Sequence, residues 1–327
     1  MAPVRDNPAD PARDHPGGGG GGGPGGAEAT YQAVRDLMPA GGPRRRGPVV
    51  VDEVAPGIAR VAVETPTLPP ATHTGCYLIG RSDLLAVDPG SPYPDQQAGL
   101  AEAIAARGRL RAIVLTHHHA DHSGGATALA AATGAPIMAH RDAAARLVGR
   151  VEVDRYLADG ERLDLGGRRI EALLTAGHAP GHLALRDLDS RATVAGDLVA
   201  GVGTILIDPD DGDMATYLAS LERLLTADVG ALLPAHGPVI DDGPAKLRAY
   251  LAHRRMREDR VVAALTDGAQ PLAPLCAIAY ADTPAWLWPL AERSLRAHLD
   301  KLVADGRAIA VDDGWRRGPG PTAPATS

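Results

Sequence analysis

The feature that most constrains the fold is a short apolar run that leads directly into a dense cluster of histidine and aspartate. The run spans residues 112–115, and the cluster consists of His117, His119, Asp121 and His122. Imidazole nitrogens and carboxylate oxygens are the ligands that zinc and similar divalent ions prefer in proteins. Gly124 and Gly125 follow the cluster and allow a tight turn into a helix. The sequence therefore predicts a metal site between a buried strand and the start of a helix.

Three later segments repeat this arrangement of an apolar strand followed by a residue that can bind metal. The predicted strands are residues 169–174, 193–194 and 231–233, and the residues beyond them are His178, Asp197 and His236. An earlier strand, residues 84–87, leads into Asp88 in the same way. Because the carboxyl ends of strands commonly carry the active groups of layered folds, the repeated placement indicates one shared site.

Short apolar runs rich in valine and isoleucine alternate with turn signals from residue 49 onward. These runs predict strands at residues 49–51, 58–63, 76–79, 84–87, 112–115 and 136–139. Helical patterns cover residues 96–106, 126–133 and 214–226. The strands first pair locally and then alternate with helices, which indicates a layered fold of the α/β or α+β class.

Beyond residue 240 the sequence pattern changes from alternating strands and helices to mainly helices. Helices are predicted at residues 244–265, 272–280 and 289–304, and two short β-like pieces follow at residues 308–311 and at Trp315. Three helices followed by a hairpin are typical of a winged-helix module. We therefore expect a catalytic domain over residues 47–243 and a winged-helix domain over residues 244–318.

The two ends of the chain differ from the rest in composition. Residues 1–46 hold a glycine run at positions 17–23 and several prolines, so we expect a disordered leader, with a disordered tail over residues 319–327. No apolar run resembles a signal peptide or a membrane helix. Two cysteines among 327 residues exclude a disulfide framework. We expect a cytoplasmic protein without a membrane partner.

The order of the motifs resembles that of the metallo-β-lactamase superfamily. Asp88, the cluster that begins at His117, and then His178, Asp197 and His236 occur in the family's order between residues 49 and 240. The resemblance implies an α+β fold, a four-layer αβ/βα sandwich, with two divalent metal ions in the cleft between its sheets. Zinc is the metal that we expect there, although manganese and iron accept the same ligands.

The resemblance also implies a role for each matching residue. The first metal would be bound by His117, His119 and His178. The second would be bound by Asp121, His122 and His236. Asp197 would bridge both metals, and Asp88 would orient their ligands through hydrogen bonds. We further expect Asp121 to act in catalysis and His182 to contact substrate or ligands, whereas His118 would have a structural role.

Motifs after the cluster resemble one subgroup, the beta-lactamase-like protein two type. They are Asp211-Gly212-Asp213-Met214, His236-Gly237-Pro238 and His253-Arg254. Members of this subgroup carry a winged-helix domain and include an endoribonuclease and thioesterases of polyketide pathways. Two metals of this kind would lower the pKa of a shared water and produce hydroxide for attack on a carbonyl or phosphoryl centre.

Three functions remain open at this point. The first is hydrolysis of a small-molecule ester or thioester, similar to a thioesterase or a hydroxyacylglutathione hydrolase. The second is cleavage of single-stranded RNA, and the third is a non-catalytic, metal-binding regulator of nucleic acid. Residues 246–317 carry 12 Lys plus Arg against 9 Asp plus Glu, a balance of 12 − 9 = +3, and the whole chain has a net charge of −7. Because nucleic-acid modules are usually strongly basic, we favour the first function and leave RNA and a homodimer open.

Overall fold

The computed structural model describes residues 30–31, 34 and 46–320. The leader expected over residues 1–46 and the tail expected over residues 319–327 lie outside the described residues, apart from positions 30, 31, 34, 46, 319 and 320. Between residues 46 and 320 the strands and helices predicted from the sequence are present, with ends that differ by a few residues. The predicted elements at 49–51, 96–106 and 289–304, for example, correspond to β1, α2 and α9.

Seven strands form the first sheet, in the order in which they occur along the chain. They are β1 (Val50–Ala55), β2 (Ile58–Glu64), β3 (His73–Gly80), β4 (Asp83–Val87), β5 (Arg109–Val114), β6 (Ile137–Ala139) and β7 (Arg155–Tyr156). Strands β1 to β4 pair antiparallel, and β4 to β7 pair parallel. Parallel neighbours need a crossover, which is supplied here by α2 (Pro94–Arg107), α3 (Ala120–Ser123), α4 (Ala126–Thr133) and α5 (Arg141–Leu147).

Five strands form the second sheet, in the order β12-β11-β10-β9-β8. They are β8 (Arg162–Leu165), β9 (Arg168–Leu174), β10 (Leu183–Asp187), β11 (Thr193–Gly196) and β12 (Leu232–Pro234). Only β11 and β12 pair parallel in this sheet, and α6 (Met214–Thr226) connects them. Helix α7 (Gly243–Ala264) follows β12.

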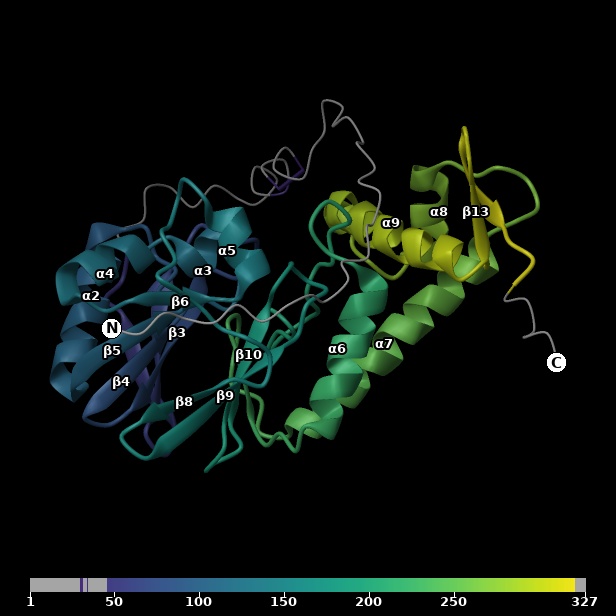
Figure 1. The fold of residues 1–327 in the computed structure, drawn as a ribbon. Helices are drawn as coiled ribbons and strands as arrows, with labels where there is room; N and C mark the ends of the chain where they lie inside the picture. The colour runs from purple at the N-terminus through teal and green to yellow at the C-terminus, as the bar shows by residue number, and fades with distance from the viewer. Residues whose placement is uncertain (1–29, 32–33, 35–45, 321–327) are drawn as a thin grey trace, which may run out of the picture.

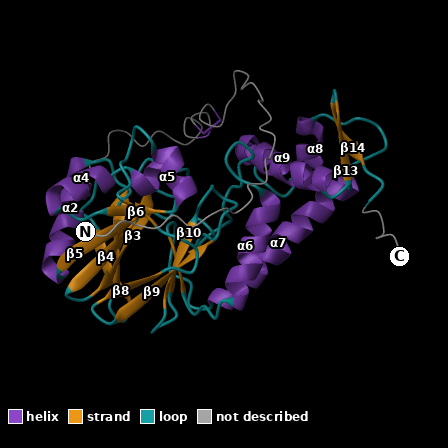
Figure 2. Ribbon diagram, viewed as in Figure 1, coloured by secondary structure: helices purple, strands orange, loops and turns teal. Residues whose placement is uncertain are grey.

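Apolar cores between the layers explain why the two sheets stack. One core lies between the sheets and includes Tyr77, Leu185 and Leu233; the Tyr77 hydroxyl also donates to the carbonyl oxygen of Pro234 at 2.7 Å. Helices α2, α4 and α5 cover the outer face of the first sheet, and α6 and α7 cover that of the second (Figure 1). Figure 2 shows the resulting order of helix, sheet, sheet and helix. The predicted α+β class and the four-layer sandwich are confirmed.

The C-terminal part folds around a core of its own. It contains α8 (Leu272–Ala279), the 3-10 turn η1 (Ala285–Leu287), α9 (Trp288–Ala304), and a hairpin of β13 (Ala308–Val311) and β14 (Gly314–Arg317). Its core includes Val261, Leu275, Leu295 and Leu302. The boundary expected at residues 243 and 244 coincides with the start of α7, but this helix packs into both domains. Leu247 lies in the core beside the second sheet, and Val261 lies in the C-terminal core.

Six elements of the described residues were not predicted: α3, α5, β7, β8, β10 and the 3-10 turn η1. Strand β10 is the central strand of its sheet and is buried along almost its whole length, so it lacks the alternation of apolar and polar residues by which strands are found. Strand β7 has two residues and pairs only with β6. No helix of the described residues is long and apolar enough to cross a membrane.

From the burial of His298 in α9 we predict that stability depends on pH in a way that does not involve the candidate metal ligands. The ring is fully buried and neither ring nitrogen has a hydrogen-bond partner among the described residues. Burial, together with Arg254 and Lys301, lowers the pKa of His298 to about 3. The unfolded chain has an ordinary histidine pKa of about 6.5, so the unfolded state binds the proton first as pH falls. The stability associated with the neutral ring is therefore complete above pH 6.5 and is lost progressively toward pH 3.

We expect His298→Leu to remove this loss, because leucine fills a similar volume and does not titrate. The difference in unfolding free energy between variant and wild type should grow by about 2 kcal/mol in favour of the variant from pH 7 to pH 5. Urea denaturation at the two pH values measures it. A difference that is the same at both values would contradict the prediction.

Candidate metal centre

The predicted ligands lie at the ends of strands from both sheets, facing the cleft between them. His117 follows β5, and His119, Asp121 and His122 lie at the start of α3 or within it. The remaining three follow strands of the second sheet, and they are His178 after β9, Asp197 after β11 and His236 after β12. The structure thus brings together side chains that are far apart in the sequence.

Three ring nitrogens converge in what we call the first triad, His117, His119 and His178. Nε2 of His117 lies 2.9 Å from Nδ1 of His119, and Nε2 of His178 lies 3.1 Å from the same Nδ1. One donor atom from each ring lies within 4.8 Å of the others. Tetrahedral zinc with bonds of about 2.0–2.1 Å places its nitrogen ligands roughly 3.4 Å apart, so the spacing suits a metal ion.

The opposite nitrogen of each ring in the first triad is already engaged. His119 donates from Nε2 to Oδ2 of Asp211 at 2.9 Å, and His178 donates from Nδ1 to the carbonyl oxygen of Leu206 at 2.9 Å. These bonds assign the ring protons to the far side, so the converging nitrogens present lone pairs to one another. Lone pairs in contact repel unless a cation lies between them. This donor set therefore fits a metal ion.

Asp88 supports ligands on both sides of the centre. It accepts hydrogen bonds from the backbone N–H of Thr116 at 2.7 Å and from the Thr116 hydroxyl at 2.6 Å. It also accepts from Nδ1 of His122 at 2.9 Å. His117 donates from Nδ1 to the Thr116 hydroxyl at 3.0 Å. Such partners fix the tautomer and the orientation of ligating histidines, and we propose this role for Asp88.

A second triad consists of Asp121, His122 and His236. Nε2 of His236 lies 3.4 Å from Oδ2 of Asp121, and Nε2 of His122 lies 3.9 Å from Oδ1 of the same residue. Nε2 of His122 is buried and has no hydrogen-bond partner among the described residues. Because buried polar atoms are rarely left without a partner, this nitrogen points to a ligand of the centre.

Asp197 lies between the two triads. Its Oδ2 is 3.6 Å from Nε2 of His178 in the first triad. Its Oδ1 is 3.4 Å from Nε2 of His236 and 3.5 Å from Nε2 of His122 in the second, and among the described residues it too is buried without a hydrogen-bond partner. One carboxylate oxygen therefore faces each triad, an arrangement that suits a bridging ligand.

Burial keeps two rings of the first triad, His117 and His178, neutral. It lowers the pKa of His178 to about 4, with a further contribution from His119, and it lowers the pKa of His117 well below the ordinary value. Both rings are therefore uncharged at pH 7. A neutral imidazole is the form that binds metal ions.

Carboxylates control the charge of the second triad. Burial alone would lower the pKa of His236, but Asp197 and Asp121 outweigh it and raise the pKa to about 10. The same two carboxylates outweigh burial at His122 and raise its pKa well above the ordinary value. A divalent cation would take the place of these protons, so metal binding should release protons and weaken as pH falls.

His182 does not reach the cleft. Its ring is fully buried, Nε2 accepts the backbone N–H of Asp197 at 3.0 Å, and Nδ1 lies 2.9 Å from the hydroxyl of Thr175. With both nitrogens engaged, the ring cannot contact substrate, and we withdraw the catalytic role that we expected. We propose instead that His182 positions the backbone of Asp197. Gly196 permits this contact, because a Cβ there would lie 2.6 Å from Nε2 of His182.

Sequence reasoning missed Asp211. Its Oδ2 accepts from Nε2 of His119 and lies 3.2 Å from Nε2 of His118, and its Oδ1 lies 3.5 Å from Arg146. We propose that His118 has a structural role, as a support for Asp211. The motif that begins at Asp211 resembles the subgroup, but the sequence gives no role to its first carboxylate; two carboxylates beside a predicted helix are the signal that could have found it.

Comparisons with known proteins agree with this geometry. The family described as the metallo-beta-lactamase superfamily matches residues 69–236, and the beta-lactamase associated winged helix domain matches residues 273–315. The chain belongs to the metallo-beta-lactamase superfamily. The predicted winged helix is thereby confirmed, and the chain is a hydrolase of this superfamily.

Three relatives from fungi and a nematode are similar in sequence to this chain. The lactamase-like protein vrtG of Penicillium aethiopicum is 31% identical over 222 residues, which cover 66% of this chain and 68% of the relative. The beta-lactamase-like protein 2 homolog of Caenorhabditis elegans is 26% identical over 265 residues, covering 78% and 87%. The atrochrysone carboxyl ACP thioesterase of Aspergillus chevalieri is 29% identical over 225 residues, covering 67% and 69%. The expected resemblance to the beta-lactamase-like protein two type is confirmed.

A solved structure supports the fold. The metallo-beta-lactamase family protein from Thermus thermophilus superimposes with a TM-score of 0.67 at 22% identity, covering 81% of this chain and all (100%) of that chain.

The cleft of this superfamily member has a volume of about 580 Å³ and opens onto both triads. Its floor includes His119, Asp121, His178, Asp197 and His236. Its walls are mainly apolar and come from residues 66–71 between β2 and β3, from residues 200–206 after β11, and from Leu290 of α9. Among the described residues, no lysine or arginine lines this cleft.

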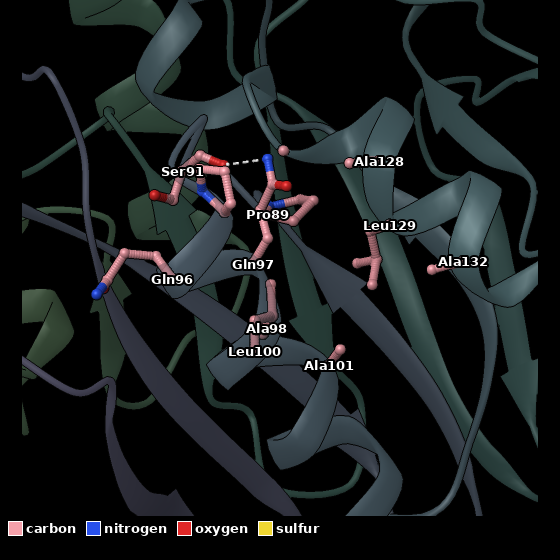
Figure 3. Close-up of a pocket in the computed structure, with 12 residues that line it drawn as sticks. Pro89, Ser91, Gln96, Gln97, Ala98, Leu100, Ala101, Ala128, Leu129 and Ala132 are labelled. Atoms are coloured by element: carbon pink, nitrogen blue, oxygen red, sulfur yellow. Dashed lines mark hydrogen bonds between the residues drawn. The ribbon is translucent and has the colours of Figure 1, made fainter.

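A smaller cavity of about 260 Å³ lies elsewhere, between α2 and α4 (Figure 3). It is lined by small and apolar residues such as Leu129 and Ala132, and the Gln97 side chain there donates to the carbonyl oxygen of Ser91 at 3.0 Å. No residue of either triad lines it. We therefore assign the chemistry of this superfamily member to the larger cleft.

Proposed function

We propose that this chain hydrolyses a small-molecule ester or thioester whose acyl part is apolar. The observation that carries the proposal is the cleft itself, with apolar walls and with no lysine or arginine among its described lining residues. Proteins that bind RNA neutralise its phosphates with lysine and arginine. An apolar acyl chain needs only a surface such as that formed by Leu68, Ile205 and Leu290.

The charges of α9 support the same choice. Arg293 pairs with Asp208 and Asp210, Arg296 pairs with Asp300 at 3.3 Å, and Lys301 pairs with Asp305 at 2.6 Å. Each cation of this helix is thus matched by a carboxylate of the chain itself. A helix that reads nucleic acid presents such groups to phosphates. One relative is named a thioesterase, which agrees with an acyl substrate.

The residues of the centre have separate tasks in this proposal. We propose that the two triads and Asp197 hold two divalent ions, with zinc as the expected metal. Bound there, these ions would activate water at neutral pH and stabilise the charge that develops on the attacked carbonyl oxygen.

Asp121 serves mainly as a ligand in this proposal. Burial raises its pKa, but His122 and His236 outweigh burial and leave the pKa below its ordinary value. A carboxylate of this kind stays ionised and binds protons weakly, so it suits a cation better than a proton. In this proposal the ligand role therefore replaces the separate catalytic role that the sequence predicts for Asp121.

A panel of acyl thioesters, carboxylic esters, phosphodiesters and short RNAs tests the proposal. We expect hydrolysis of the acyl substrates, with kcat/KM rising as the acyl chain lengthens by up to about fourfold per methylene until the cleft is filled. Leu68→Ser should reduce kcat/KM for a long-chain ester more than for an acetyl ester. Ile278→Ser is the matched control, because Ile278 is exposed on α8 and does not line the cleft. If the chain cleaves only RNA, with a steep dependence on salt, the acyl assignment would be overturned in favour of cleavage of single-stranded RNA.

A further inference from the structure

One loop supplies the outer partners of two metal ligands. Residues 205–213, which we call the support loop, connect the region after β11 to α6. The carbonyl oxygen of Leu206 accepts from His178, and the carboxylate of Asp211 accepts from His119, each at 2.9 Å. Two of the three rings of the first triad thus take their orientation from this loop.

The support loop is fastened by side chains from the C-terminal helices. Arg293 of α9 donates from Nη2 to Oδ1 of Asp208 at 2.6 Å, and it also contacts Oδ2 of Asp208 and the carboxylate of Asp210. Asp208 is 6% exposed, so this pair is shielded from water. Arg254 of α7, 3% exposed, donates to the carbonyl oxygen of Ile205. The loop is therefore held at its start by α7 and at its middle by α9.

The contact between the Arg293 guanidinium and the Asp208 carboxylate fixes the relative orientation of the two side chains as well as attracting them. A guanidinium binds a carboxylate through two parallel N–H groups, which sets the angle between the two groups as well as their distance. Tyr31 adds a third direction, because its hydroxyl donates to the same Oδ2 of Asp208. Asp210, which also contacts Arg293, has a largely exposed side chain.

We propose that Arg293 is a positioning residue of the metal centre, which orients His119 and His178 through the support loop. The C-terminal domain thereby contributes to metal affinity without supplying a ligand. The inference rests on the metal centre proposed above but not on the identity of the substrate. Loss of the outer partner of a ligand commonly weakens metal binding by about 10–100-fold. Because Arg293 acts one step further out, we expect a loss near the lower end of that range.

Competition with a chelator tests this inference on the purified full-length chain loaded with zinc or cobalt(II). Arg293→Ala should weaken the affinity for the metal by about tenfold, and the visible spectrum of the cobalt-loaded protein should change. Arg293→Lys should recover only part of the loss, because lysine keeps the charge but not the paired N–H geometry. Arg255→Ala is the matched control: Arg255 joins α7 to α6 through Glu222 at 2.8 Å on the exposed surface and should leave both readouts unchanged.

The outcomes separate this inference from the metal centre on which it depends. Wild-type affinity and an unchanged cobalt spectrum in Arg293→Ala would overturn the inference alone, as would equal losses in Arg293→Ala and Arg255→Ala. A wild-type chain that binds no metal would overturn both. If Arg293→Ala does not fold, Asp210→Asn provides the same test, because the Asp210 side chain contacts Arg293 and is otherwise largely exposed. It should weaken metal binding by a smaller factor, and no change there would count against the inference.

Discussion

Asp197→Ala is expected to abolish hydrolysis and to remove most of the bound metal. Asp197 faces both triads, with Oδ2 toward His178 and Oδ1 toward His122 and His236. Without it, the remaining donors are the histidines of the two triads and a single carboxylate, Asp121. We expect activity on acyl substrates to fall by about a thousandfold or more.

Metal analysis and kinetics on the same preparation check this result. The wild-type chain should hold about two divalent ions, and the variant should hold fewer than one. Asp189→Ala is a suitable control, because Asp189 also follows a strand of the second sheet but is exposed and pairs only loosely with Arg169 at 3.9 Å. Full metal content in Asp197→Ala would show that the carboxylate is not a shared ligand, and the dinuclear assignment would fail.

Asp88→Ala is expected to give the largest loss of stability among single substitutions near the centre. The carboxylate is 1% exposed and accepts three hydrogen bonds, two from Thr116 and one from His122. Alanine would leave these buried donors without a partner, at a cost of about 2–4 kcal/mol. The residue also has a φ of 54°, a left-handed conformation that alanine tolerates less well than aspartate or asparagine.

Chemical denaturation of the metal-free chain measures this loss apart from any effect of metal binding. Asp88→Asn should lie between wild type and alanine, since asparagine accepts the left-handed backbone and retains one acceptor oxygen. In the metal-loaded chain, affinity for the metal should fall by about 10–100-fold in the alanine variant. Equal stability of Asp88→Ala and wild type would show that the hydrogen bonds from Thr116 contribute little.

The residues that we propose as ligands could be predicted from the sequence because they lie beyond the carboxyl ends of strands. A strand with a buried face shows its position through its apolar residues, and the next few residues must then lie at the edge of the sheet. His178, Asp197 and His236 could be found in this way from the sequence alone. The same reasoning could not predict which residues hydrogen-bond to the proposed ligands from behind, because those contacts depend on how the layers stack.

Asp211 and His182 show where that reasoning ends. Asp211 supports His119 across 92 positions of the chain, and nothing local in the sequence marks the pairing. His182 lies four residues from His178 and resembles a site residue by proximity, yet the turn at Gly181 directs it behind Asp197. Strand β10 was missed for a related reason, since both of its faces are covered by other elements.

The structure also bears on the role of the C-terminal domain. Its mild positive balance left nucleic acid open, but the structure pairs the cations of α9 with carboxylates of the same chain. Leu290 of the same helix lines the cleft. The domain thus takes part in forming the cleft, which agrees with a role as a cap on a small-molecule substrate.

Helix α7 has a consequence for how this protein can be divided. Its first half covers the second sheet with Leu247 and Leu251, and its last turns enter the C-terminal core with Val261 and Ala264. A cut before the helix would uncover the sheet, and a cut after it would leave the C-terminal core incomplete. The two domains therefore share α7 as part of both of their cores. Neither domain, separated from this helix, keeps a complete core.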